Sequence, residues 1–199
     1  MKKELYLTVN SEIPYEEVFV HLKAALMGGI NKVLLTKYKQ YTEVELALII
    51  EMCHNYEAEL YIPNDAKFAE EINCDGVHYD KLPEMIELKN LSKEFKYGVT
   101  VSAKSEDIQQ AIEAKVDYIY IANYDMEGSK DCIDQMGLKT LLDNFKNITI
   151  EIYIESSINV EELKGIKNLP IAGIMFTSEI FNQEDITSYF KNIDSILNS

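Results

Sequence analysis

The chain has 199 residues, of which 47% are hydrophobic and 27% charged, values typical of a soluble globular domain. Its net charge of −15 repels polyanions, which argues against nucleic acid and anionic membrane surfaces as partners. The cysteines Cys53, Cys74 and Cys132 form no CxxC pair or Cys/His cluster, which argues against a structural zinc site and a disulfide framework.

Apolar residues at period 2 predict strands, and apolar residues at helical spacing predict helices between them. The expected strands are residues 4–9, 32–36, 59–62, 76–78, 96–102, 118–122, 148–154 and 171–176. The expected helices are residues 15–27, 43–56, 66–72, 82–91, 106–114, 136–145, 160–166 and 186–197. Strands that alternate with helices run parallel, so we expect a single-domain (β/α)8 TIM barrel over residues 1–199. A doubly wound open sheet is the alternative.

Two sets of strand residues have separate expected places in such a barrel. Tyrosines are expected to fill its interior, namely Tyr6, Tyr61, Tyr120 and Tyr153. Polar residues at the strand ends are expected to gather around one mouth, namely Thr8, Thr36, Asn64, His78, Ser102, Asn123, Glu155 and Thr177. His78 is expected to be structural, while His21 and His54 are expected on the surface of helices.

Several segments carry a resemblance in their order along the chain. They are LYLTVN, AALMGGINKVLL, PND, CDGVHYDKLP, the stretch from YGVTVSAKSED to DYIYIANY, then SK, IESSIN and GIMFTSEIF. Together these segments resemble the thiamine phosphate synthase and thiazole tautomerase family, small barrels of thiamine biosynthesis. None of the segments is decisive alone, so the resemblance rests on their order and spacing.

The resemblance implies roles for particular residues. It implies Mg²⁺ held by Asp65 and Asp80, and a pyrophosphate held by Ser129 and Lys130. Asn123 stands where the tautomerases carry a catalytic His, so Lys130 and Asn123 are the catalytic candidates. The expected ligand contacts are Thr36, Asn64, Ser102, Ser129, Glu155, Ser156, Ser157, Thr177 and Ser178.

Ordinary structural roles compete with several of these assignments. Lys130 has the alternative of a solvated surface lysine, and Asp65 that of capping the helix that follows it. Ser157, Thr177 and Ser178 have the alternative of capping helices, and Asp80 is expected in solvent.

The departures from the family concern positive charge. The family's Arg and Lys on the second strand fall at Thr36 and near Tyr38, and the Arg after its metal-binding Asp falls at Ala66. Strand alternation is expected to point Lys37 away from the Thr36 face. The phosphate-binding Gly pair is replaced by Ser156 and Ser157.

These features predict a divergent cytoplasmic member of the family. It would bind a small phosphorylated ligand of thiazole or pyrimidine type at the mouth, with synthase activity weak or lost. The alternative is a non-catalytic ligand-binding or regulatory barrel. The apolar run at the start of the chain is too short for a signal peptide, and no apolar run approaches the length of a membrane span. A homodimer is compatible with the sequence.

Overall fold

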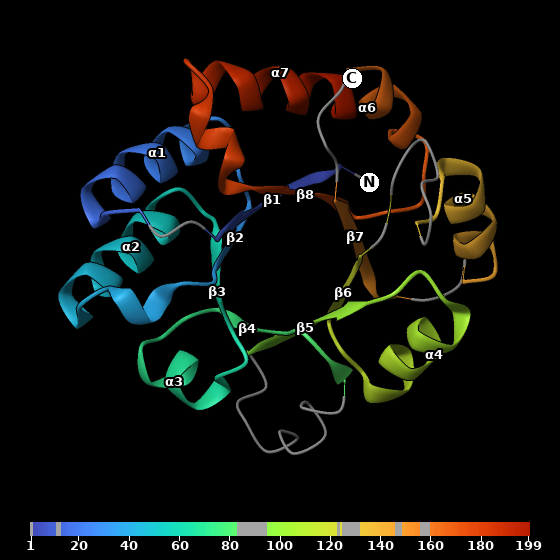
Figure 1. Ribbon diagram of the computed structural model, residues 1–199, viewed down its shortest axis with the longest axis horizontal. Helices are drawn as coiled ribbons and strands as arrows, with labels where there is room; N and C mark the ends of the chain where they lie inside the picture. Colours follow the sequence, from blue (N-terminus) through green and yellow to red (C-terminus); the bar gives the residue numbers. More distant parts are fainter. Residues whose placement is uncertain are drawn as a thin grey trace.

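In the computed structural model, eight parallel strands close into a barrel, and helices surround it (Figure 1). The structure describes residues 2–10, 13–82, 95–122, 124, 132–145, 149–155 and 160–199. The strands are β1 (Glu4–Val9), β2 (Lys32–Leu35), β3 (Glu59–Pro63), β4 (Gly76–Tyr79), β5 (Lys96–Val101), β6 (Tyr118–Ile121), β7 (Glu151–Glu155) and β8 (Gly173–Thr177). Because β1 pairs with both β2 and β8, the predicted (β/α)8 barrel is confirmed and the open sheet is excluded.

The described helices start close to where the sequence predicts them. They are α1 (Tyr15–Met27), α2 (Glu43–Asn55), α3 (Ala66–Glu71), α4 (Ser105–Ala114), α5 (Gln135–Asp143), α6 (Val160–Ile166) and α7 (Ile186–Asn198), with the short 3₁₀ helices η1 (Tyr38–Gln40) and η3 (Ser178–Asn182). Thr42 and Glu45 form a capping box at α2, which satisfies backbone N–H groups at its start. The expected helix 82–91 lies almost entirely outside the described residues. Among the described helices, none combines the length and apolar character that a membrane span requires.

Side chains alternate across each strand and form two separate apolar clusters. Outward side chains such as Leu7 and Ile119 pack against the helices. Inward side chains form the second cluster, which contains Tyr6, Leu34, Tyr61, Tyr118, Tyr153, Ala172 and Met175, with the half-buried Tyr120 against it. The predicted tyrosine filling is confirmed, and Tyr118 belongs to it as well.

The tyrosine rings contact one another edge to face in the barrel interior. Tyr153 lies 5.6 Å from Tyr6 and 5.6 Å from Tyr118 between ring centroids, with interplanar angles of 85° in both pairs. Such pairs each add about 0.5–1.5 kcal/mol beyond burial. Glycines provide the room, because a Cβ on Gly98 would lie 1.9 Å from the Tyr118 ring and one on Gly76 would lie 2.7 Å from Tyr61.

Charged side chains lie below the tyrosines, at the N-terminal ends of the strands. The Lys32 ammonium is 3% exposed and lies 2.7 Å from Glu59, 3.3 Å from Glu4 and 3.6 Å from Glu151. Lys96 also pairs with Glu59. Two tyrosine hydroxyls donate into this layer, from Tyr61 to Glu59 at 2.7 Å and from Tyr153 to Glu151 at 3.0 Å. A buried ammonium is tolerated here because carboxylates surround it.

The ionic layer shifts the pKa of its central carboxyl. Burial by itself raises the pKa of Glu59, but hydrogen bonds from Lys32, Lys96 and Tyr61 outweigh burial and lower the pKa to about 2. Glu59 therefore stays charged in the folded protein at pH values where it would be protonated in the unfolded chain.

Removing the central ammonium should cost much of the stability of the barrel. We predict that Lys32→Met lowers the free energy of unfolding by about 3–5 kcal/mol, since it leaves the surrounding carboxylates without their buried partner. Lys67→Met is the matched control, because Lys67 is 86% exposed and pairs with Glu71 at 3.8 Å. Urea unfolding should give a change below about 1 kcal/mol for the control. Equal losses in the two variants would contradict the structural role of the ionic layer.

The same layer predicts a loss of stability in acid. The folded pKa of Glu59 is lowered from 4.5 to about 2, so its stabilisation is present above pH 4.5 and is lost as the pH falls toward 2. Glu59→Gln should therefore lose stability less steeply than the wild type over this interval, in urea unfolding at successive pH values. Glu71→Gln, in an exposed ion pair, should keep the wild-type slope. An unchanged slope in Glu59→Gln would count against the assignment.

Candidate functional site

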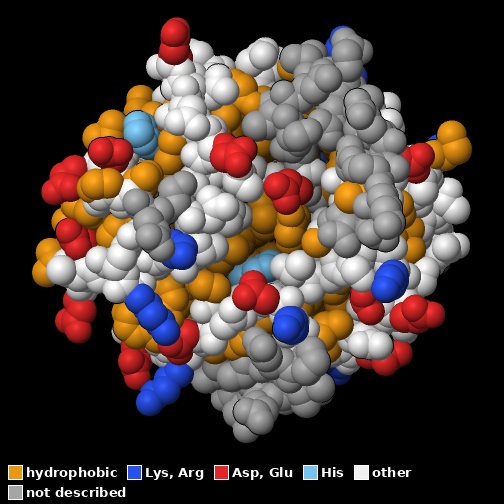
Figure 2. All heavy atoms as spheres, in the orientation of Figure 1, with side chains coloured by type: hydrophobic (Ala, Val, Ile, Leu, Met, Phe, Trp, Pro, Cys, Tyr) orange, Lys and Arg blue, Asp and Glu red, His pale blue; other side chains and the backbone are white. Residues whose placement is uncertain are grey.

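Polar side chains gather where the strands end. Seven of the eight expected mouth residues lie within one residue of the end of their strand, namely Thr8, Thr36, Asn64, His78, Ser102, Glu155 and Thr177. Because the strands run parallel in a closed barrel, these ends share one rim. Asn123 lies outside the described residues. In the view down the barrel, apolar and uncharged atoms line the centre, and carboxylates and lysines stand around it (Figure 2).

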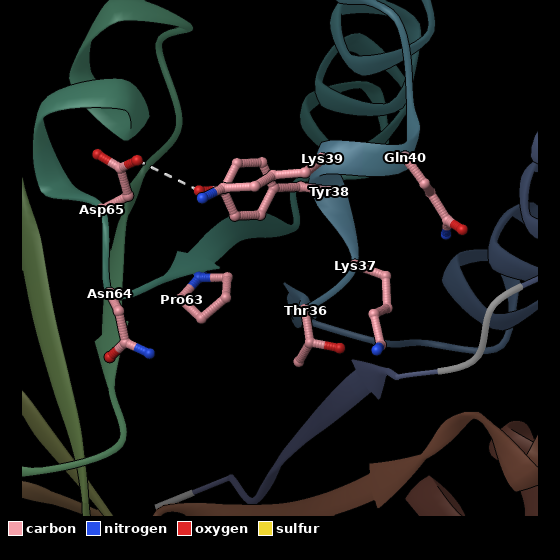
Figure 3. A pocket seen from close by; sticks show the side chains of 8 residues that line it. All are labelled: Thr36, Lys37, Tyr38, Lys39, Gln40, Pro63, Asn64 and Asp65. Atoms are coloured by element: carbon pink, nitrogen blue, oxygen red, sulfur yellow. Dashed lines mark hydrogen bonds between the residues drawn. The ribbon is translucent and has the colours of Figure 1, made fainter.

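A cavity of about 550 Å³ opens between the ends of β2 and β3. Its lining consists of Thr36, Lys37, Tyr38, Lys39, Gln40, Pro63, Asn64 and Asp65 (Figure 3). Two local features of the sequence shape it. β2 ends at Leu35 and the chain turns into η1, while Asn64 takes the left-handed region at φ 55° before Asp65 starts α3. Asn tolerates this conformation better than most residues, which allows the sharp exit from β3.

The expectation for Lys37 was wrong. Alternation would have turned it away from Thr36, but both residues line the same cavity. The reason is that β2 ends at Leu35, so the pleat no longer governs the next two residues. Two lysines, Lys37 and Lys39, therefore border the cavity, and the Lys39 ammonium lies 5.5 Å from the Tyr38 ring centroid.

Both carboxylate oxygens of Asp65 accept hydrogen bonds. Its Oδ1 accepts from the Phe68 backbone N–H at 3.1 Å, which caps α3 as the alternative reading expected. Its Oδ2 accepts from the Tyr38 hydroxyl at 3.2 Å, the contact drawn across the cavity in Figure 3. The Tyr38 ring stacks on Phe68 at 5.3 Å. Burial, together with the charge of Asp65, raises the pKa of Tyr38 to about 12, so this hydroxyl stays protonated and donates.

Asn64 and Asp80 join the ends of β3 and β4. The Asn64 amide donates to the Asp80 carboxylate at 2.8 Å, and the Asp80 backbone N–H donates to Asn64 Oδ1 at 3.1 Å. Asp80 is exposed, as expected. Across the described ranges, no group of three or more His, Cys, Asp or Glu side chains is arranged to hold a metal ion. Asp65 fits as one carboxylate of a Mg²⁺ ion that also binds ligand phosphates, but the described residues form no preassembled metal cage.

His78 is buried beneath the mouth, and both of its ring nitrogens are hydrogen-bonded. Nδ1 lies 3.0 Å from the Tyr118 hydroxyl and Nε2 lies 2.8 Å from the Thr100 hydroxyl. The residue is 2% exposed, and burial lowers its pKa to about 4, with a smaller opposing effect from Asp80. The imidazole is therefore neutral at physiological pH. His54 is exposed as expected, and His21 is partly exposed on the outer helix α1, with its ring 5.1 Å from that of Phe181.

Several of the other predicted ligand-binding residues make hydrogen bonds within the protein. Ser102 donates to Asp107, and Glu155 accepts from Tyr120. Ser178 donates to Asn10, and Thr177 precedes η3 without a capping hydrogen bond from its side chain. The described residues therefore show no capping by the Thr177 hydroxyl. The remaining predicted residues, Asn123, Ser129, Lys130, Ser156 and Ser157, lie outside the described residues, and all ligand roles remain predictions.

Sequence reasoning missed three features of this mouth. It did not find the hydrogen bond between Tyr38 and Asp65 or the hydrogen bond between His78 and Tyr118. It also did not find that the Thr8 hydroxyl oxygen is buried without a hydrogen-bond partner among the described residues. Strand alternation puts Tyr118 on the same face as the predicted Tyr120, and Gly98, which pairs with Tyr118, was a further usable signal that the prediction did not use. The contact between Tyr118 and His78 joins β4 to β6, two strands apart in the barrel, and local patterns do not report such contacts.

Solved structures share this fold. A thiamine phosphate pyrophosphorylase from Pyrococcus furiosus superposes with a TM-score of 0.76 at 18% identity, over 98% of this chain and 96% of that one. A 3-hexulose-6-phosphate synthase from Salmonella typhimurium gives a TM-score of 0.71 at 13% identity, over 98% of each chain. At these identities the likeness concerns the fold alone.

Sequence comparison gives the family. The chain is 27% identical to a thiamine-phosphate synthase of Clostridium perfringens over 98% of this chain and 85% of that protein. It is 24% identical to a thiamine-phosphate synthase of Thermoplasma acidophilum over 92% of this chain and 87% of that protein. The family model described as thiamine monophosphate synthase matches residues 5–180. The chain therefore belongs to the thiamine monophosphate synthase family, as the order of its strand-end motifs had predicted.

Proposed function

We propose that this protein binds a phosphorylated thiazole or pyrimidine-type ligand at the barrel mouth and turns over the synthase reaction weakly or not at all. Family membership supports the ligand class. The chemistry of the cavity between β2 and β3 supports the weak turnover. An alternative is a ligand-binding or regulatory barrel that has no catalytic role.

The observation that carries the proposal is the contact between Tyr38 and Asp65. By resemblance, synthases place cationic side chains on this part of the mouth, where departure of pyrophosphate builds strong negative charge. Here a neutral phenol reaches across the cavity to the carboxylate, and Thr36 stands in the position of an Arg. Stabilisation of developing charge by fixed donors is a large part of catalysis, so loss of these cations should slow the chemical step.

The residues of the mouth still suit binding. Lys37 and Lys39 border the cavity and offer positive charge to a phosphate, and Thr36 and Asn64 add polar side chains. Tyr38, whose ring stacks on Phe68, adds an aromatic side chain to the lining of the cavity. Ser129 and Lys130 are proposed to contact the phosphate, as the family resemblance implies, with the loops after β7 and β8 contributing from the other side.

Mg²⁺ is proposed to enter with the phosphates of the ligand. When bound it would neutralise phosphate oxygens, and Asp65 is the described carboxylate best placed to share it. Asp80 is proposed as a second contact, and its carboxylate accepts a hydrogen bond from Asn64.

We predict slow release of pyrophosphate when the protein is mixed with the pyrimidine diphosphate, the thiazole phosphate and excess Mg²⁺. Two missing cationic contacts, at about 2.7–4 kcal/mol each, would reduce turnover by a factor on the order of 10⁴ or more. Restoring positive charge should recover part of it, so we predict that Thr36→Arg with Tyr38→Lys raises pyrophosphate release by roughly tenfold to a hundredfold.

The control for this experiment is Thr140→Arg, the same change on an exposed position of α5. It should leave pyrophosphate release at the wild-type level. Wild-type turnover near 10 s⁻¹, about the median for enzymes, would contradict the proposal of weak activity. Thermal unfolding of each variant checks that differences in activity do not come from loss of the fold.

Without a phosphorylated ligand, the protein is expected to bind Mg²⁺ poorly. We expect no saturable binding of Mg²⁺ alone at millimolar concentration in calorimetry, because Asp65 is the sole carboxylate lining the described cavity and both its oxygens accept hydrogen bonds. Tyr38→Phe removes one of these donors and should strengthen Mg²⁺ binding relative to the wild type. Tight binding by the wild-type protein would overturn this expectation.

A further inference from the structure

Four side chains form a line of hydrogen bonds from the barrel centre to the mouth. The hydroxyls of Tyr6 and Tyr118 lie 2.8 Å apart, and the Tyr118 hydroxyl lies 3.0 Å from His78 Nδ1. His78 Nε2 lies 2.8 Å from Thr100 Oγ1. Tyr6 and Tyr118 are fully buried, His78 is nearly so, and Thr100 is half-buried at the mouth end of β5.

When the imidazole is neutral, the hydrogens of this line can run in two directions in which Tyr118 both accepts and donates; a third arrangement, with Tyr6 and Nδ1–H both donating to Tyr118, leaves the buried Tyr118 hydrogen unpaired. A neutral imidazole carries one N–H, so one ring nitrogen donates and the other accepts. In the outward direction Tyr6 donates to Tyr118, Tyr118 donates to Nδ1, and Nε2–H donates to Thr100. In the inward direction each of these hydrogen bonds is reversed, and Thr100 donates to Nε2.

The two directions differ at the buried end. In the inward direction the hydroxyl hydrogen of Tyr6 needs an acceptor, and within the described part of the chain the polar partner of this hydroxyl is Tyr118, which already donates to it. Leaving that fully buried donor unpaired costs its desolvation free energy. In the outward direction every buried hydrogen has an acceptor, and the hydrogen left over belongs to Thr100, at the mouth. The outward direction is therefore favoured.

We propose that Tyr118 is a positioning residue that holds His78 as the Nε2–H tautomer, so that the Thr100 hydroxyl accepts from His78 and donates to the ligand. The mouth then requires a hydrogen-bond acceptor at this position of the ligand, such as a phosphate oxygen or a ring nitrogen. The ligand part of this proposal rests on the proposed function, and the tautomer does not.

The tautomer is tested on the ligand-free, full-length protein labelled with ¹⁵N in its histidines. Long-range ¹H–¹⁵N spectra near neutral pH should show His78 with a protonated Nε2 and an unprotonated Nδ1. The variants His21→Gln and His54→Gln assign the other two histidine signals. A His78 signal with the proton on Nδ1, or a mixture of tautomers in the wild type, would overturn the proposal.

Two tyrosine variants separate positioning from packing. Tyr118→Phe removes the donor to Nδ1 and should shift the Nδ1 resonance, whereas Tyr6→Phe leaves that donor in place and should keep the Nε2–H tautomer. Tyr97→Phe is the matched control, because its buried hydroxyl on the same strand as Thr100 has no hydrogen-bond partner among the described residues. It should leave the His78 signals unchanged. Unchanged His78 signals in Tyr118→Phe would count against the proposal, and loss of the Nε2–H tautomer in Tyr6→Phe would count against it as well. If Tyr118→Phe does not fold, the tautomer of the wild-type protein decides the proposal.

Binding of thiamine phosphate tests the donor role of Thr100. Thr100→Val should weaken binding about tenfold, the effect of one lost hydrogen bond, while Thr100→Ser should stay within about twofold of the wild type. Equal binding by the Val variant would refute the donor role even if His78 is the expected tautomer. Wild-type protein that does not bind thiamine phosphate would contradict the proposed function, and the tautomer spectra would then decide the present inference alone.

Discussion

The packing of tyrosine rings inside the barrel is the constraint on which the rest of the structure depends. Four rings from β1, β3, β6 and β7 pack against one another, mostly edge to face, and glycines on the neighbouring strands leave them room. Their hydroxyls point to polar groups above and below, to His78 on one side and to Glu59 and Glu151 on the other. The interior is thereby a packed core that joins a charged lower layer to an uncharged floor beneath the mouth.

That floor shapes what the mouth can do. His78 is neutral and saturated with hydrogen bonds, so it supplies no charge to a ligand. Beside it, Tyr38 holds Asp65 across the cavity where, by resemblance, related synthases place cations. The chain belongs to the thiamine monophosphate synthase family, and binding of a phosphorylated ligand at the mouth is the function proposed for it. The proposal of weak turnover rests on Thr36 and Tyr38 standing where, by resemblance, the synthases carry cationic side chains.

Much of the fold could be predicted from the sequence, because alternation and helical spacing are local signals. The strand ends followed as well, so Thr36, Asn64 and His78 were placed at the mouth before the structure was known. Three features could not be predicted. First, β2 ends early, at Leu35, which brings Lys37 into the cavity. Second, the hydrogen bond between Tyr38 and Asp65 joins residues 27 positions apart in the sequence. Third, the hydrogen bond between Tyr118 and His78 joins residues 40 positions apart. Such contacts depend on barrel register and side-chain rotamers, which a single sequence does not specify.

The most direct test of the central claim compares ligands by thermal unfolding of the full-length protein. A ligand that binds the folded state raises the unfolding midpoint in proportion to the logarithm of its concentration. We predict a concentration-dependent rise of the unfolding midpoint with thiamine phosphate in the absence of Mg²⁺, and a smaller rise with unphosphorylated thiamine. No shift with thiamine phosphate, with or without Mg²⁺, would contradict the claim that the barrel mouth is a working ligand site.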